Sequence, residues 1–514
     1  MLIDIKNIRP PITRFIFLFF FFVFTTNYGC SKVPNDDLPF STVRSKIEDH
    51  IKEKNIPSIS VAVAKDGEII WEESFGFSDV EKQIKATPHT MYHLGSLGKA
   101  YTATAIMILK EQGLIDLDKP VNDYLGESKI QAYEGNVADA TVRRILNHTS
   151  GLPYFWTHLY EHELDQRPSW DEVIDHYGKI VSPPGERYIY SNLAMGILGY
   201  VIERISGKPY AEFIKTEIFD PLGLSRTHID PGRPYDEEYI AQKYAPEGRV
   251  PYSDHICKGG GTVFASAHDL VRFGMFHLKN HAEGMQPILS DQSIEDMQNS
   301  RSANTPYGIG WHSFNKFGYK VVLHGGHVVG ARSSLRLMPT KNIAVAVVSN
   351  GEDADTPKIC DWIFAELLTR YNAFFTIREA FSGGNKNDPG RFSPPATLIG
   401  TWQGSIKMFE GDVPVQLIVK PDGDVRMKYL NEDYAENEGV TSVEGQIPRF
   451  ANGVFHASFP LEIPTPFTNR YNHSVNFHLK LRGNVLSGYI SAEAGEPLKP
   501  HFCVPYYMRL EKPE

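Results

Sequence analysis

A serine and a lysine three residues apart carry the clearest chemical signal in this sequence. Ser96 and Lys99 stand in the segment Gly95-Ser96-Leu97-Gly98-Lys99, at the start of a stretch with a helical pattern. Residues three apart on a helix lie on the same face, so these two side chains can meet. A serine hydroxyl is a weak nucleophile, and a lysine whose pKa is lowered by desolvation can serve as its base. The spacing predicts nucleophilic catalysis by Ser96 with Lys99 as its partner.

The same spacing occurs a second time, which shows that it is not specific by itself. Ser313 and Lys316 also stand three apart, but they precede a strand pattern, in which side chains alternate between faces. Only Ser96 is followed by a long helical stretch, residues 100–112. The position in the chain therefore favours Ser96 over Ser313 as the nucleophile.

Tyr190 and Asn192 form the second candidate group. They follow Pro183-Pro184-Gly185-Glu186 and lead into a predicted helix. A tyrosine near a catalytic lysine can relay the serine proton, and an asparagine amide can hold both the lysine and a substrate carbonyl. Tyr429 and Asn431 repeat the pattern, but in a β-rich region where packing and a turn explain it.

The third candidate group is His324-Gly325-Gly326-His327, which follows the apolar residues 321–323. Glycines there let a substrate approach the edge of a strand, and the amide of His327 can join that of Ser96 in binding an oxyanion. The alternative interpretation is a glycine-rich turn between two strands.

Strands at both ends and helices in the middle must position these groups. Hairpin patterns at residues 59–71 and 334–348 lie on either side of most of the motifs, and a helical pattern follows at 359–367. Apolar periodicity between the hairpins predicts three helices, at residues 99–112, 141–146 and 193–205.

The three motifs, in this order, resemble those of the serine β-lactamase and penicillin-binding-protein-like family, most of all its class C branch. Further matches are the segment from Leu146 to Leu152, with His148-Thr149-Ser150-Gly151, and the run Gly259-Gly260-Gly261. The resemblance covers about residues 40–375. It implies an α+β fold, an α/β sandwich in which helices flank an antiparallel sheet, with a helical subdomain and the active site between the two.

The resemblance also implies roles for individual residues. Ser96 corresponds to the acylated nucleophile, Lys99 and Tyr190 to the proton-transfer pair, and Asn192 to a ligand of the substrate carbonyl. The amides of Ser96 and His327 would form the oxyanion hole, and His324 and Gly326 would line the edge strand. Neither a cofactor nor a metal is implied.

One departure from the family pattern bears on the substrate. His324 stands where β-lactamases and transpeptidases usually have a lysine that binds the substrate carboxylate. A histidine with an ordinary pKa is mostly neutral at pH 7. The departure favours an esterase, a D-aminopeptidase or another peptidase over a β-lactamase, with hydrolysis through an acyl-serine in each case.

Two other function classes compete with this interpretation. His158, Glu161 and His162 fit a zinc-peptidase pattern, in which helical spacing places both histidines on one face, although no third ligand is identifiable. Relatives of this kind also exist as catalytically silent sensors or binding proteins, but the presence of Ser96, Lys99 and Tyr190 favours an enzyme. The α/β-hydrolase elbow is absent, because Leu94 stands two residues before the serine.

The composition of the chain limits the kinds of binding partner that we expect. The chain has 514 residues with 52 basic and 62 acidic side chains, a formal net charge of −10. Without a basic block, nucleic acid is not expected as a partner, and a small-molecule or peptide substrate is. Hydrophobic residues make up 41% of the chain and charged residues 22%, which excludes a wholly disordered or multi-spanning membrane protein. The sequence contains no pattern that indicates the oligomeric state.

The first 29 residues have the pattern of a signal peptide, since basic residues precede the apolar run 15–24, which is too short to span a bilayer. Asn27-Tyr28-Gly29-Cys30 resembles a bacterial lipoprotein processing site, at which Cys30 is lipidated, although Asn27 stands where leucine is preferred. We expect an extracytoplasmic protein, either anchored in the membrane as a lipoprotein or secreted. The remaining cysteines, Cys257, Cys360 and Cys503, are expected to be buried free thiols.

A break in composition divides the chain. Residues 40–380 correspond to the hydrolase domain, and residues 381–396, rich in Gly, Asn and Pro, to a linker. Residues 397–514 show apolar residues at every second position, which predicts an antiparallel β domain. Gly400-Thr401-Trp402-Gln403-Gly404 resembles the first strand of a lipocalin-like barrel. A module that packs against the cleft and shapes it is favoured over a separate ligand site.

Overall fold

The computed structural model describes residues 40–229, 239–280, 282–299, 305–382, 392–408, 411–430, 440–441, 446–461, 463, 473–494 and 502–513. The expected signal peptide, Cys30 and most of the expected linker lie outside these residues. None of the helices that the described ranges contain has the length and hydropathy needed to cross a membrane.

The first region is built on an antiparallel sheet of seven strands among the described residues. Their order is β13 (His312–Lys316), β14 (Tyr319–Val328), β15 (Ala331–Met338), β16 (Ile343–Ser349), β1 (Ser58–Lys65), β2 (Glu68–Asp79) and β3 (Ile84–Lys85). Both predicted hairpins are confirmed, as β1 with β2 and β15 with β16. They are joined because β1 pairs with β16, from Ile59 opposite Ser349 to Lys65 opposite Ile343.

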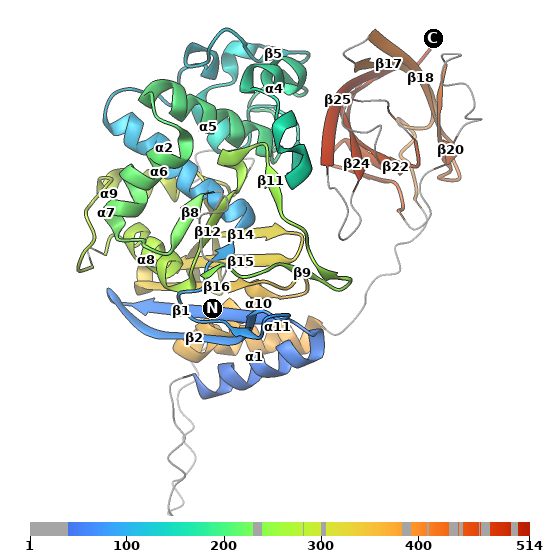
Figure 1. Ribbon diagram of the computed structural model, residues 1–514. Helices are drawn as coiled ribbons and strands as arrows, with labels where there is room; N and C mark the ends of the chain where they lie inside the picture. Colours follow the sequence, from blue (N-terminus) through green and yellow to red (C-terminus); the bar gives the residue numbers. More distant parts are fainter. Residues whose placement is uncertain are drawn as a thin grey trace, which may run out of the picture.

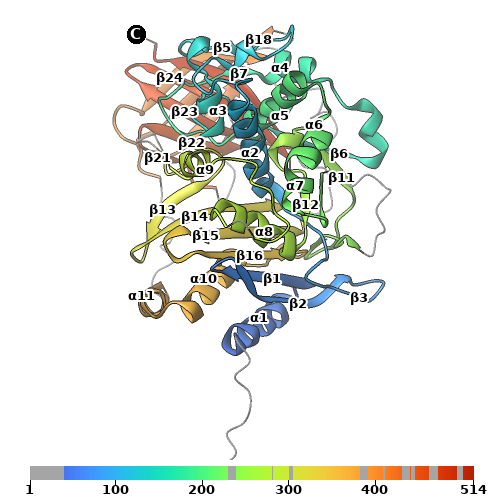
Figure 2. The ribbon, with the colours of Figure 1, turned by 90° about the vertical axis from the view of Figure 1, so that its left-hand side faces the viewer.

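Helices cover both faces of this sheet (Figure 2). On one face lie α1 (Ser41–Lys54), α10 (Thr356–Leu367) and α11 (Thr369–Ser382), which pack with alternate residues of β1, Ile59, Val61 and Val63. On the other face lies α8 (Ala267–His277), which meets the small residues Ala62 and Ala64 between them. At Gly274 of α8 a Cβ atom would stand 3.0 Å from Leu335, so the helix packs closely on the sheet. Because successive side chains of a strand point to opposite faces of the sheet, β1 packs against both helical layers.

A helical subdomain lies beyond α8. It contains α2 (Gly98–Glu111), α3 (Val142–Leu146), α4 (Trp170–Tyr177), α5 (Asn192–Ser206), α6 (Tyr210–Ile214) and α7 (Asp220–Leu222). The three predicted helices are confirmed as α2, α3 and α5. Gly207, with φ of 70°, ends α5 in the left-handed conformation that glycine adopts without strain.

Short strands connect the subdomain to the sheet. Three of them, β4 (Tyr92–His93), β12 (Val263–Ala265) and β8 (Thr227–Ile229), form one small sheet. The others are β5 (Gln131–Ala132) with β7 (Lys179–Ile180), β9 (Tyr244–Ala245) with β10 (Gly248–Arg249), and β6 (Trp156–Tyr160) with β11 (Ser253–His255). Helix α9 (Asp291–Met297) completes the first region.

The second region is a curved antiparallel sheet (Figure 1). Its strands follow the order β20 (Val440–Thr441), β19 (Val425–Tyr429), β18 (Gly411–Val419), β17 (Gly400–Met408), β25 (Phe502–Glu511), β24 (Val485–Ala494), β23 (Ser474–Arg482), β22 (Val454–Phe459) and β21 (Arg449–Ala451). Alternate residues of β18 and β23 are buried, as the sequence predicts. In the described part of the chain the end strands β20 and β21 do not pair with each other, so the expected barrel is observed as a half-barrel.

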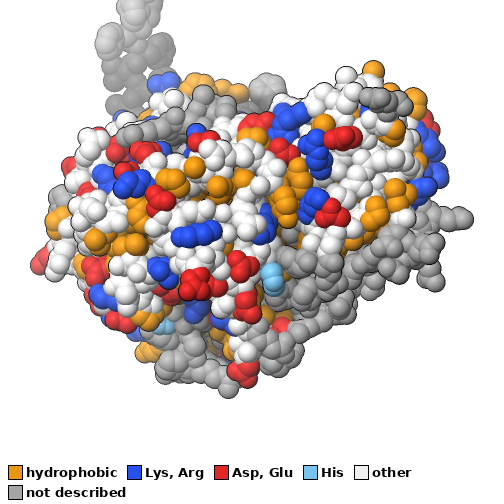
Figure 3. All heavy atoms as spheres, turned by 90° about the horizontal axis from the view of Figure 1, so that it is seen from above, with side chains coloured by type: hydrophobic (Ala, Val, Ile, Leu, Met, Phe, Trp, Pro, Cys, Tyr) orange, Lys and Arg blue, Asp and Glu red, His pale blue; other side chains and the backbone are white. Residues whose placement is uncertain are grey.

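The two regions share hydrogen bonds. Strand β25 pairs with β6, Phe502 opposite Thr157 and Cys503 opposite Trp156, and β6 pairs in turn with β11. The Tyr507 hydroxyl donates to Glu134 at 2.6 Å. The half-barrel is therefore continuous with a strand pair of the first region. On the face seen in Figure 3, acidic and basic side chains are interspersed rather than gathered by sign.

The three described cysteines, Cys257, Cys360 and Cys503, are free and buried, which confirms the expectation for them.

Candidate active site

Ser96 lies in the 3₁₀ turn Gly95–Leu97, directly before α2. Gly95 has φ of 55°, which lets the chain leave β4 and enter this turn without the strain that a side chain would bring. The ammonium group of Lys99 donates a hydrogen bond to the Ser96 hydroxyl, with 3.1 Å between Nζ and Oγ. The structure therefore brings the predicted pair into contact.

Lys99 has no exposed surface. Besides the Ser96 hydroxyl, its ammonium group binds the carbonyl oxygen of Gly260. Burial penalises the charged form and lowers the pKa of Lys99 to about 7. A substantial fraction of the molecules thus carries an unprotonated amine at neutral pH, which is what a base for the Ser96 proton needs.

The carbonyl that binds Lys99 belongs to a glycine turn wedged between α2 and α5. A Cβ atom at Gly261 would stand 2.6 Å from the carbonyl oxygen of Gly95, and one at Gly259 would stand 2.4 Å from that of Met195. The Thr102 hydroxyl donates to the Gly259 carbonyl at 2.8 Å and holds the turn in place. Only glycine fits at these two positions, so the run noted as a family match has a steric role beside Lys99.

Tyr190 lies next to the pair, in the loop before α5. The ammonium group of Lys99 is 4.8 Å from the centroid of the Tyr190 ring, and the tyrosine hydroxyl bonds to the side chain of Ser96. Burial raises the pKa of Tyr190 above its usual value. Tyr190 therefore stays protonated at neutral pH, which suits a proton relay and leaves the role of base to Lys99.

Asn192 is the first residue of α5, whose N-terminus is capped by the Ser191 hydroxyl, which accepts from the Ala194 amide at 3.0 Å. The Asn192 side chain is largely buried, bonds to Tyr154, and lines the same cavity as Ser96. Asn192 and Ser96 thus face one space, as the sequence predicts.

Strand β14 passes close to the turn that carries Ser96. At Gly326 a Cβ atom would stand 1.7 Å from the carbonyl oxygen of Leu94, so only glycine permits this approach. A Cβ atom at Gly95 would stand 2.8 Å from the backbone nitrogen of His327, which places that amide beside the nucleophile. The His327 imidazole points to solvent and pairs with Glu352 at 2.6 Å, so it is the backbone of His327 that faces the turn.

His324 does not line the cleft, which corrects the sequence-based expectation. It is 2% exposed and lines neither cavity beside Ser96. Its Nδ1 donates to the Gly325 carbonyl at 2.7 Å, and its Nε2 accepts from the Tyr307 hydroxyl at 2.8 Å. Burial lowers the pKa of His324 to about 3. The ring is therefore neutral and its two nitrogens are occupied within the protein.

Two cavities meet at Ser96. The first has a volume of about 310 Å³ and is closed on the far side by β6, β11 and the β9–β10 hairpin. Its lining there is largely aromatic and includes Tyr154, Trp156, His158, Tyr160 and His255. The second, of about 550 Å³, lies between Gly325–His327 and residues 353–357. An acyl group and a leaving group can therefore occupy opposite sides of the nucleophile.

The zinc interpretation of His158, Glu161 and His162 is wrong. It requires both histidines on one helical face, but His158 lies in strand β6 and Glu161 begins a separate 3₁₀ turn. The His158 ring instead contacts the Ser253 hydroxyl, 3.2 Å from Nδ1, and lines the first cavity.

Sequence reasoning missed Lys243, which lines the first cavity just before β9. Among the described residues, its ammonium group has no hydrogen bond or ion pair. Burial lowers the pKa of Lys243 to about 8, so the side chain is mostly protonated at pH 7. The segment around it, Gln242-Lys243-Tyr244, has no motif that could have signalled a cation in the cavity.

Comparison with known proteins identifies a family and several relatives of this chain. The profile of the family described as Beta-lactamase matches residues 43–368. Protein flp of Staphylococcus aureus (strain MW2) is 25% identical over 345 residues, which cover 64% of this chain and 67% of that protein. Penicillin-binding protein 4* of Bacillus subtilis (strain 168) is 28% identical over 274 residues, 49% of this chain and 58% of that one. The chain thus spans two thirds or less of the length of these relatives.

Solved structures with similar folds include two that cover nearly the whole chain. The octameric penicillin-binding protein homologue from Pyrococcus abyssi has a TM-score of 0.55 at 23% identity and covers 92% of this chain and 100% of that one. SurE has a TM-score of 0.57 at 20% identity and covers 91% and 98%. A class C beta lactamase from Rhodobacter sphaeroides, with a TM-score of 0.53 at 20% identity, covers 64% of this chain and 98% of its own. These likenesses show the fold of both regions.

Proposed function

The chain belongs to the beta-lactamase family of serine hydrolases, and on that premise we propose that it is an exported hydrolase that cleaves an ester or peptide carbonyl through an acyl-Ser96 intermediate. The observation that carries the proposal is the hydrogen bond of 3.1 Å between the Ser96 hydroxyl and a completely buried lysine whose pKa is lowered to about 7. This pair supplies a nucleophile together with its base.

The acylation step uses the groups around Ser96. Unprotonated Lys99 takes the hydroxyl proton as Ser96 Oγ forms a bond to the substrate carbonyl carbon. The amides of Ser96 and His327 stabilise the oxyanion, and Asn192 binds the amide or carbonyl of the substrate. The proton then passes from Lys99 through the Tyr190 hydroxyl to the leaving oxygen or nitrogen as its bond to the carbonyl carbon breaks. Water hydrolyses the acyl-serine by the same proton path in reverse.

The first cavity supports a particular substrate class. Its aromatic wall suits an apolar group, and the unpaired Lys243 ammonium suits an anionic one, because a cation desolvated without a partner gains most from a bound anion. His324 offers no charge, since it is buried and neutral. We therefore propose an ester or peptide with an apolar portion and a carboxylate as the substrate.

Reaction with two covalent probes tests the function. The intact mass of the protein is measured before and after treatment with a fluorophosphonate and, separately, with a penicillin, in parallel with Ser96→Ala. We expect a fluorophosphonate adduct that is lost in Ser96→Ala, and no lasting penicillin adduct. Absence of any adduct, with no hydrolysis of p-nitrophenyl esters, would instead assign the chain to the binding proteins built on this fold.

The export part of the proposal rests on residues 1–29 and on Cys30 as a lipidation site. Metabolic labelling with a radioactive fatty acid in a bacterial host, followed by membrane fractionation, tests it. We expect label in the wild type and none in Cys30→Ser. Unlabelled enzyme outside the cytoplasm would indicate a secreted protein that is not lipidated. Enzyme confined to the cytosol would refute export.

A further inference from the structure

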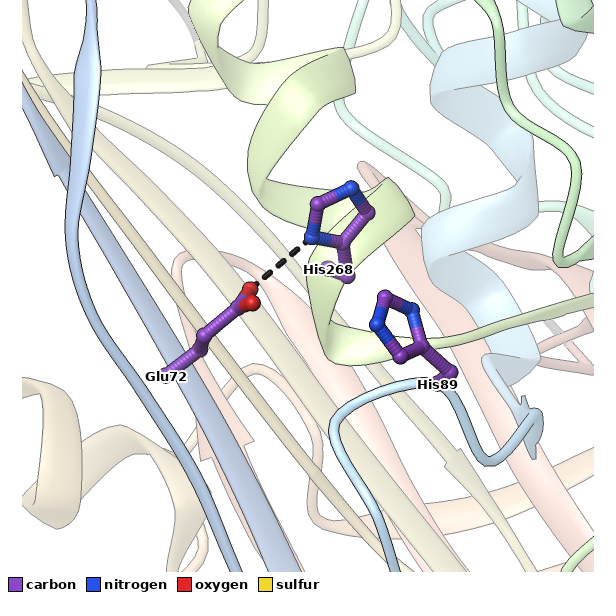
Figure 4. A group of neighbouring side chains, drawn as sticks. All are labelled: Glu72, His89 and His268. Carbon is purple, nitrogen blue, oxygen red and sulfur yellow. Dashed lines mark hydrogen bonds and ion pairs between the residues drawn. The ribbon is translucent and has the colours of Figure 1, made fainter.

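A second cluster of ligand-type side chains lies outside the catalytic cavity (Figure 4). Glu72 comes from β2, His89 from the loop before β4, and His268 from the first turn of α8. One ligand atom from each of the three lies within 4.8 Å of the other two. None of these residues lines either cavity beside Ser96.

The contacts within the cluster leave one histidine without a partner. His268 Nδ1 donates to a carboxylate oxygen of Glu72 at 2.9 Å. The ring of His89 stands 4.8 Å from that of His268, centroid to centroid, and one of its nitrogens faces the Glu72 carboxylate. His89 forms no hydrogen bond through its ring within the described ranges. A pair of Glu72 and His268 alone would not need a second imidazole turned toward it.

Backbone contacts fix two of the segments that carry these side chains, the loop around His89 and the start of α8. The His268 amide donates to the carbonyl oxygen of Pro88 at 3.2 Å, which ties the loop to α8. Thr87 and Thr90 close a tight turn around His89, since the Thr90 amide donates to the Thr87 carbonyl at 2.9 Å. Metal binding would therefore not have to order this loop, and the conformational entropy lost would be mainly that of the side chains.

We propose that Glu72, His89 and His268 form a binding site for a divalent transition-metal ion of the Zn²⁺ type, with water in the remaining coordination positions. Two imidazoles and one carboxylate are a common ligand set for Zn²⁺, whereas Ca²⁺ and Mg²⁺ prefer oxygen atoms only. Ligand atoms about 2.0–2.1 Å from a tetrahedral ion lie about 3.3 Å apart. The Glu72 and His268 atoms are 2.9 Å apart and no separation in the cluster exceeds 4.8 Å, so side-chain rotations can bring the three atoms to that spacing.

Metal binding at this site would connect β2, the loop that contains His89, and α8. His268 would bind through Nδ1, the nitrogen that now donates to Glu72. Its ring would then carry its proton on Nε2, so the Nδ1 proton would be exchanged through solvent for one on Nε2 and the ring would stay neutral. The loop continues through β4 to Gly95 and Ser96, so the ion would brace the segment that leads to the nucleophile. The site is therefore structural, and its occupancy is expected to show in stability before it shows in catalysis.

Zinc binding by the full-length protein, produced without a polyhistidine tag and treated with EDTA, tests the proposal. Inductively coupled plasma mass spectrometry after gel filtration should find one Zn²⁺ per chain. At zinc concentrations about a hundredfold above Kd, Tm should rise by about 5 °C. Substitution of Co²⁺ should give visible absorption bands that report nitrogen and oxygen ligands.

Single substitutions identify the ligands. His89→Ala should lose the zinc-dependent rise in Tm and the cobalt bands, while its metal-free Tm stays within about 1 °C of the wild type, because the side chain is exposed. Glu72→Gln should keep a hydrogen bond to His268 but weaken zinc binding. His176→Ala, which removes an exposed histidine on α4, is the matched control and should bind zinc as the wild type does. Zinc bound equally by His89→Ala, or not bound by the wild type, overturns the proposal.

Discussion

The two sides of the first cavity are built in different ways. On one side Ser96, Lys99 and the glycine turn are tightly packed, and Lys99 has no exposed surface. On the other side the wall consists of the strand pair β6 with β11 and of the segment around β9, which carries Lys243. Strand β6 also pairs with β25 of the half-barrel. In the proposed function the first side supplies the reacting groups, and the second side would contact the rest of the substrate. Chemistry and substrate choice would then be carried by separate parts of the chain.

The two sides of the cavity also differ in the free-energy cost of the cations they hold. The packed side keeps a lysine desolvated, which costs stability but provides a base. The wall has partly exposed aromatic side chains and one unpaired cation, Lys243, whose desolvation a bound anion would offset. Variants on the packed side should therefore change the rate of acylation, and variants on the wall should change which substrates react.

The largest effect is expected from Ser96→Ala. Loss of the nucleophile should lower kcat by at least about 10⁴-fold for every ester tested. Binding of the substrate should persist, because the wall is untouched. Steady-state kinetics and equilibrium binding of the same ester to Ser96→Ala measure the two quantities. Residual turnover near the wild-type rate would show that another residue is acylated.

Lys99→Met should come next, with a loss of about 10²–10⁴-fold in the rate of acylation. The same variant should be more stable than the wild type at pH 7, because methionine removes a buried ammonium group. Stopped-flow acylation and thermal unfolding measure the two effects on one protein sample. A variant that is both slower and less stable would contradict the assigned cost of burying Lys99.

The pH dependence follows from the same side chain. The pKa of Lys99 is lowered from 10.5 to about 7, so its base form prevails above pH 7. The value of kcat/KM should rise about tenfold per pH unit below 7 and level off above it. Between pH 7 and 10.5 the unfolded chain holds the extra proton, so this group should raise the free energy of unfolding by up to about 1.4 kcal/mol per pH unit. Lys99→Met should lack both trends.

On the wall, Lys243→Met should change selectivity. We expect the ratio of kcat/KM for an ester with a carboxylate to that for its neutral methyl ester to fall about 10- to 100-fold. Lys243→Arg keeps the charge and should retain most of the ratio. Paired kinetics on the two esters measure it, and an unchanged ratio in Lys243→Met would remove Lys243 from substrate binding.

The smallest effect is expected where the half-barrel contacts the loop after β5 in the first region. Tyr507→Phe removes the hydrogen bond of 2.6 Å to Glu134 and should cost about 1 kcal/mol in the free energy of unfolding. Acylation by the fluorophosphonate should stay unchanged, because this contact lies outside the catalytic groups. Chemical denaturation and labelling rates check the two statements. A slower labelling rate would show that the contact with the half-barrel influences the groups that react with the fluorophosphonate.

Local patterns in the sequence were enough to predict much of the molecule. The hairpins, the helices α2, α3 and α5 and the alternating strands of the second region follow from periods of 2 and 3.6 and from glycine stop signals, which act over a few residues. The contact between Ser96 and Lys99 was predictable for the same reason, since one helical turn joins them.

What the sequence could not determine depends on segments that are distant along the chain. His324 has an ordinary context on its strand, and only the packing of Tyr307 against it shows that it is buried and neutral. Lys243 lies beside the cavity because the next residue, Tyr244, donates its amide to the carbonyl oxygens of Gly330 and Asn350, about 90 to 100 residues further along the chain. Strand β6 is held by β25, more than 300 residues away. Burial and charge compensation are set by such long-range contacts, which short-range periodicity does not record. The sequence therefore determined the candidate reacting groups, and the tertiary structure decided what lines the cavity beside them.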